Sequence, residues 1–305
     1  MDMEQFLIFT GRNLKLYFRD RIAVFFSLLS MIITIVLMVF FLGNMNTDAI
    51  TDLLAQFPNR NYIEDEKNAQ LLIYSWTSAG IISMNAVTVT LAVYATMIKD
   101  RMSGKLNSIY TAPVSRTIIT ISYIATAWIA AIIVCVFTLA VTEIYGMIQG
   151  LEVYSIEKHI HIFGSICMNS FVYAAFMYLL ALIAKSEGAW SGIGTIVGTL
   201  VGFLGAIYIP IGSLAESMQS LLKCTPMIYS TALFREIMLK SILNHTFRGI
   251  SKDVTRQYRE AMGIDITIFD HSVSGVEISI VLLFIGIAFV GIDVYILKYS
   301  KKVDR

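Results

Sequence analysis

The chain alternates long apolar runs with shorter polar segments. A helix needs roughly 20 apolar residues, at 1.5 Å per residue, to cross a bilayer core about 30 Å thick. Runs of that length occupy residues 22–42, 73–98, 118–142, 160–184, 189–209 and 278–297. The first five contain no charged residue, and the sixth contains only Asp293 near its end. The runs do not alternate with a period of two and are too long for barrel strands of about ten residues. The pattern predicts an all-α membrane protein with six transmembrane helices in one domain over 1–305.

Composition supports this fold class. The chain is 56% hydrophobic and 15% charged, whereas a soluble domain is about 25% charged. The net charge of +1 is uninformative about nucleic acid, but no basic stripe with interleaved aromatic residues appears, so no nucleic-acid partner is predicted. The three cysteines follow no disulfide or metal-binding spacing, which favours free thiols.

Lys and Arg near the ends of the runs predict the orientation of the protein. Thirteen of the 23 basic residues lie in the N-terminal segment, in the loops at 99–117 and 185–188, and in the tail. Because cytoplasmic loops are enriched in Lys and Arg, both termini are expected in the cytoplasm of a multi-pass plasma-membrane protein.

Residues 4–20 have the pattern of an amphipathic helix lying on the inner leaflet. Basic and apolar side chains fall on opposite faces, Arg12, Lys15 and Arg19 against Leu7, Leu14 and Phe18. The segment is either a simple membrane anchor or an elbow that contacts a partner.

Three polar segments are predicted on the outer side, a short one around 147–159 and two longer ones. Residues 43–72 have the composition of a loop, and 210–277 form a long extracytoplasmic segment. Within the latter, 226–243 has helical spacing, but Arg235, Glu236 and Lys240 make it a poor span, so we expect a helix near the outer surface. Residues 244–276 are mixed and charged, as in a small external subdomain of unassigned role.

Small and polar residues mark helix contacts within the spans. Gly194, Gly198 and Gly202 recur every four residues and define one face, either for general helix packing or for a pathway or subunit interface. Asn85 and Asn169 lie near mid-membrane and are expected to form hydrogen bonds between helices.

Several chemistries are missing from the sequence. There is no Walker A pattern, no H-E-x-x-H and no G-x-S-x-G. His159 and His161 suit a membrane boundary better than a zinc site, and no metal site is predicted. The span centres carry no charges that would couple transport to an ion gradient. We therefore expect that the chain is not an enzyme, that it binds no cofactor and that a partner protein supplies the energy for transport.

The loop KDRMSGKLNSIYTAPVSR at 99–116 resembles that of ABC-2 type permeases, the membrane subunits of ABC exporters. The matching or adjoining positions are Asp100, Arg101, Gly104, Lys105, Leu106, Pro113, Ser115 and Arg116. The resemblance implies a cytoplasmic coupling helix between the second and third spans that docks on a separate ATPase subunit, where ATP and Mg would bind.

A second stretch, CTPMIYSTALFREIM at 224–238, resembles the segment before the last helix of this family. The matching positions are Pro226, Tyr229, Leu233 and Arg235. The resemblance also implies pairing with a second permease, either another copy or a homologue.

The function that these features predict is ATP-driven export of a hydrophobic or amphipathic substrate, such as a drug, an antimicrobial peptide or a lipid-like molecule. Alternatives are a permease for a lipid-linked glycan, cation extrusion, or a non-transporting sensor or assembly protein. The absence of paired catalytic residues argues against an intramembrane enzyme.

Overall fold

The computed structural model describes residues 2–37, 43–58, 60–105, 114–268 and 271–299. The described elements are α1 (Asp2–Arg19), α2 (Arg21–Leu37), α3 (Gly43–Ala55), α4 (Tyr62–Met102), α6 (Arg116–Ile148), α7 (Ile156–Ile183), α8 (Glu187–Leu204), α9 (Glu216–Lys223), α10 (Pro226–Thr246), α11 (Lys252–Ala261), β1 (Ile266–Ile268), β2 (His271–Val273) and α12 (Gly275–Tyr299). The fold is a helical bundle with one short antiparallel hairpin, β1–β2.

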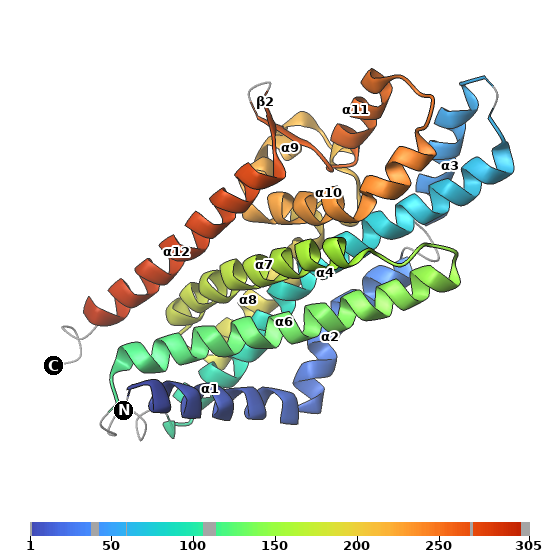
Figure 1. Cartoon of the computed structure of the whole chain (residues 1–305). Coiled ribbons are helices and arrows are strands. Elements are labelled where there is room, and N and C mark those ends of the chain that lie inside the picture. The colour runs from blue at the N-terminus through green and yellow to red at the C-terminus, as the bar shows by residue number, and fades with distance from the viewer. Residues whose placement is uncertain (1, 38–42, 59, 106–113, 269–270, 300–305) are drawn as a thin grey trace.

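Helix α4 is the centre of the bundle, and α6, α7, α10, α3 and α2 all pack against it (Figure 1). With 41 residues it is about 60 Å long, roughly twice the hydrocarbon thickness of a bilayer. The prediction of a loop over 43–72 is therefore wrong, because α3 and the first turns of α4 occupy this segment. The side chains of Ile50, Leu54 and Leu72 are buried there, so packing supplies the stability that the local composition does not.

Four helices of the described residues are long and apolar enough to cross a membrane: α4, α6, α7 and the Gly275–Ile296 part of α12. The other two expected spans correspond to α2, with 17 residues, and α8, with 18. The multi-pass membrane class is thus shown, whereas the number of six spans stays a prediction.

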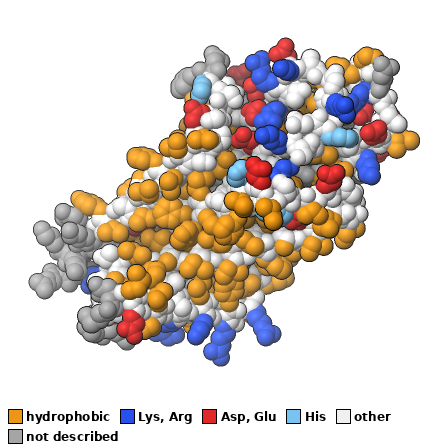
Figure 2. Space-filling view, in the orientation of Figure 1, with side chains coloured by type: hydrophobic (Ala, Val, Ile, Leu, Met, Phe, Trp, Pro, Cys, Tyr) orange, Lys and Arg blue, Asp and Glu red, His pale blue; other side chains and the backbone are white. Residues whose placement is uncertain are grey.

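Polar and apolar side chains segregate along the bundle. Hydrophobic side chains cover the middle of the face shown in Figure 2, and charged ones gather at its two ends. Helix α1 lies at one end, where α12 also ends; we call this the α1 end (Figure 1). The opposite end consists of α3, the start of α4, the end of α10, α11 and the β1–β2 hairpin, and we call it the polar cap (Figure 1).

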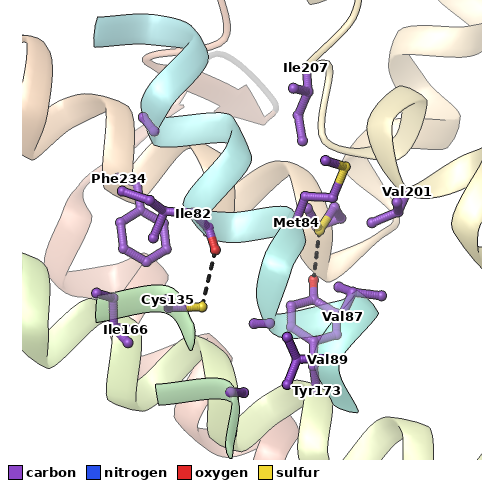
Figure 3. Close-up of a cluster of buried hydrophobic side chains, with 14 of the residues drawn as sticks. Ile82, Met84, Val87, Val89, Cys135, Ile166, Tyr173, Val201, Ile207 and Phe234 are labelled. Carbon is purple, nitrogen blue, oxygen red and sulfur yellow. Dashed lines mark hydrogen bonds between the residues drawn. The ribbon is translucent and has the colours of Figure 1, made fainter. Parts of the chain in front are cut away.

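The core lies where α4, α6, α7 and α10 meet, as the close-up in Figure 3 shows with Ile82, Cys135, Ile166 and Phe234. Two side-chain amides in this core donate hydrogen bonds between helices, as the sequence predicts for Asn85 and Asn169. The amide of Asn85 donates to Thr138 Oγ1 on α6 at 2.7 Å. The amide of Asn169 on α7 donates to the Ser83 carbonyl at 3.1 Å.

Candidate coupling site and Arg235 cluster

Asp100, in the last turn of α4, is the buried centre of a small ionic cluster at the α1 end. Its Oδ2 accepts a hydrogen bond from Arg12 Nη2 at 2.8 Å, and Lys105 Nζ lies 4.0 Å from its Oδ1. The predicted outward basic face of α1 is therefore correct for Lys15 and Arg19, which are exposed, but wrong for Arg12. Arg12 fixes α1 to the end of the central helix instead.

Arg101, the next residue, ties α4 to α7. Its guanidinium donates to the carbonyl of Ala184, the residue that caps α7, and to that of Ala181 at 3.3 Å. The last carbonyls of a helix lack partners within the helix and carry a partial negative charge. A guanidinium both donates hydrogen bonds to them and balances this charge. Arg101 thus links the end of α4 to the end of α7 within the chain.

Gly104 lies two residues after the end of α4 and has a φ of +75°, a conformation that glycine adopts without strain. A Cβ there would meet nothing within 4 Å, so the requirement is one of backbone geometry. Ser115 is the N-cap of α6, where its Oγ accepts from the Ile118 amide at 3.2 Å, and Arg116 is the first residue of that helix. Leu106 and Pro113 lie outside the described residues, so the coupling helix itself stays a prediction.

The residues of the second motif all lie on α10, and three of them have simple structural roles. Pro226 occupies the first helical position, where its missing amide proton costs nothing. The Tyr229 hydroxyl donates to the Lys223 carbonyl at 2.7 Å and joins α10 to α9. Leu233 is buried in a small apolar cluster with Ile278 of α12. The predicted helix over 226–243 is confirmed, with α10 at Pro226–Thr246.

Arg235, the fourth residue, is completely buried. Its Nη2 donates to the Ala206 carbonyl at 2.7 Å, and its Nη1 to the carbonyls of Met262 and Gly263 at 3.2 and 3.3 Å. No carboxylate of the described residues forms an ion pair with it. Burial lowers the pKa of Arg235 to about 9, which leaves the guanidinium charged at neutral pH. Its charge is balanced by carbonyl dipoles and by the face of Trp76, 4.1 Å away.

Two further residues, not identified from the sequence, form contacts in this half of the molecule: Trp76 belongs with Arg235 to what we call the Arg235 cluster, whereas Arg60 lies at the C-terminal end of α10. Trp76 on α4 donates from its indole to the Met262 carbonyl at 2.8 Å. Arg60, just before α4, pairs with Asp65 and donates to the Thr246 carbonyl at 2.8 Å, close to the end of α10. A tryptophan within an apolar run and an arginine in a polar segment carry no spacing signal, so only the tertiary structure shows these contacts.

The three glycines of α8 do not form one uniform packing face. A Cβ at Gly202 would lie 2.2 Å from the Tyr208 ring, and one at Gly194 would lie 3.3 Å from Leu91. A Cβ at Gly198 would meet nothing within 4 Å. Gly202 and Gly194 therefore serve packing within the chain, whereas Gly198 faces open space.

The histidines have ordinary surroundings in the described part of the chain. His159 Nε2 lies 2.9 Å from Glu143 Oε2, which joins α7 to α6, and His161 is exposed. No group of three or more His, Cys, Asp or Glu side chains among the described residues could hold a metal ion.

The described residues form a multi-pass helical membrane protein with a polar cap and with charged contacts between helices at the opposite end. The sequence over residues 42–292 matches the family described as ABC-2 family transporter protein, and the chain belongs to this family. No match is found among curated proteins.

Proposed function

We propose that the chain is the permease subunit of an ATP-driven exporter, powered by a separate ABC ATPase subunit on which ATP and Mg are bound. The α1 end faces the cytoplasm of a plasma-membrane protein with six spans and both termini inside. A second permease, identical or homologous, completes the transporter. The cargo is a hydrophobic or amphipathic molecule, because the spans are apolar and carry few charges.

The observation that carries this proposal is the continuity of α4. This helix runs without a break from the ionic cluster of Asp100 and Arg101 to Trp76 and Asp65 in the outer half. At its cytoplasmic end it holds α1 through Arg12 and α7 through Arg101. A tilt imposed on the loop that follows Gly104 would therefore move three helices together and reach the polar cap as a rigid-body motion.

The residues of this loop divide into two roles that experiments can separate. Arg101 is half-buried and bound within the chain, so it transmits force to α7. Lys105 is 67% exposed on its side chain, so it is available to a docking ATPase. We expect Lys105→Glu to reduce binding of the ATPase, and Arg101→Gln to leave binding in place but to reduce transport.

The test is co-expression of the chain with an ABC ATPase from the same genomic neighbourhood, followed by purification through a tag on the permease. Copurification with wild type, its loss in Lys105→Glu and its retention in Lys185→Glu, an exposed lysine after α7, would support the docking role. Transport of a fluorescent amphipathic dye into inverted vesicles then reports function. If no ATPase copurifies with wild type, the chain is a stand-alone membrane protein, such as a sensor or assembly factor.

A further inference from the structure

A pocket of about 370 Å³ lies in the polar cap, between the end of α10 and α11. None of its lining residues belongs to the ionic cluster at the α1 end or to the Arg235 cluster. Its volume lies in the range of small-molecule sites, which span about 300–1,000 Å³. Charged side chains gather over this end of the molecule in Figure 2.

One wall of the pocket is apolar. Leu243 and Phe247 from the end of α10 are buried beneath it, and Ile250 closes the turn that follows. The Phe247 ring lies 4.7 Å from that of Tyr258, centroid to centroid, so α11 is held against α10 and the pocket is part of the packed structure.

The other wall is cationic. Lys252, Arg256 and Arg259 follow one another at intervals of four and three residues and lie on one face of α11. Their positive charges are not equally balanced by acidic side chains. Arg259 is held by both oxygens of Asp265 at 2.6 Å, so that its charge is neutralised.

Two cationic side chains, those of Lys252 and Arg256, remain available to a ligand. Arg256 approaches Asp253 only to 4.0 Å, with both side chains largely exposed, and such a contact is weak. Lys252 has no ion-pair partner among the described residues, and it is exposed at the pocket edge. An ordinary water-exposed helix face would explain why these residues are charged. It would not explain why they lie beside a pocket with an apolar wall.

We propose that this pocket binds an amphipathic anion, with its carboxylate or phosphate group at Lys252 and Arg256 and its apolar part against Phe247 and Leu243. The position of the pocket on the outer side rests on the proposed function, but the binding itself does not. The same chemistry could come from an anionic lipid of the outer leaflet or from a soluble amphiphile that the transporter releases.

The test uses the purified full-length chain in nanodiscs of phosphatidylcholine and dodecyl phosphate as the probe, with binding measured by calorimetry. Dodecyl maltoside, a neutral amphiphile with the same alkyl chain, is the matched ligand. The double variant Lys252→Gln/Arg256→Gln removes the cations, and Arg248→Gln, an exposed arginine outside the pocket lining, is the control variant. We expect the double variant to weaken dodecyl phosphate binding by about tenfold or more, since two charge-assisted hydrogen bonds are lost.

Equal affinity of wild type and double variant for dodecyl phosphate would overturn the proposal, and so would equal affinity of wild type for dodecyl maltoside. Nanodiscs containing phosphatidylglycerol identify the source of the anion. If this lipid competes with dodecyl phosphate for the wild type, the ligand is a lipid headgroup; if it does not compete, the ligand is a soluble amphiphile. The measurement needs no ATPase, so its result is independent of the copurification test above.

Discussion

The guanidinium carbon of Arg235 lies 4.1 Å from the centre of the Trp76 ring, and both side chains contact the carbonyl of Met262. Three parts of the chain thereby meet at one point: the central helix α4, the helix α10 and the turn after α11. We interpret this contact as the attachment of the polar cap to the bundle, because its members are completely buried and far apart in sequence.

Arg235→Ala would leave the Ala206 and Gly263 carbonyls without their donor and open a cavity. We expect it to lower the free energy of unfolding by about 2–4 kcal/mol. Trp76→Phe, which loses the indole hydrogen bond and part of the cation–π contact, should cost about 1–2 kcal/mol. Thermal unfolding in detergent micelles measures both, with the exposed Arg256→Ala as control. Unchanged midpoints for both variants would contradict the attachment role.

The pair of Arg12 and Asp100 should hold α1 to the end of α4. Because the Arg12 side chain is 33% exposed, we expect a modest coupling energy of about 1 kcal/mol in a double-mutant cycle. The exchange Arg12→Asp/Asp100→Arg should recover part of the stability that either single variant loses. Lys15→Gln, on the exposed side of α1, provides the comparison. Additive effects of the two single variants would show that the pair does not stabilise the protein.

Asp293 is completely buried in α12, and neither carboxylate oxygen accepts a hydrogen bond from a described residue. A buried charge without a partner costs several kcal/mol, or forces the carboxyl to stay protonated. We therefore expect Asp293→Asn to raise the thermal midpoint at neutral pH. Asp265→Asn provides the contrast, since it breaks the two hydrogen bonds from Arg259 and should lower the midpoint. A lower midpoint for Asp293→Asn would indicate that the carboxylate has a stabilising partner.

Gly202→Ala and Gly198→Ala test the two explanations for the glycines of α8. The first introduces a methyl group against the Tyr208 ring, which must move, so we expect a loss of about 1–3 kcal/mol. The second meets no atom of the chain, and its higher helix propensity should leave stability equal or slightly greater. Reduced transport in Gly198→Ala at unchanged stability would support a pathway or a subunit interface, and unchanged transport would leave only helix packing.

The long apolar runs at 118–142, 160–184 and 278–297 correspond closely to α6, α7 and α12. A bilayer imposes this simple rule on length and composition, so one sequence is enough to find such helices. The hydrogen bonds that Asn85 and Asn169 each form to a neighbouring helix could also be predicted, because a polar group inside a membrane bundle needs a partner.

The sequence by itself thus determined the membrane class, the approximate positions of the helices, and, through its loop motifs, the family. The tertiary structure alone decided that α4 extends to Tyr62, that Arg12 turns inward to Asp100, and that Trp76 meets Arg235. It also decided that the end of α10 and α11 enclose a pocket with an apolar and a cationic wall. The physical reason is the same in each case: these features depend on contacts between residues distant in sequence, which neither local hydropathy nor helical periodicity records.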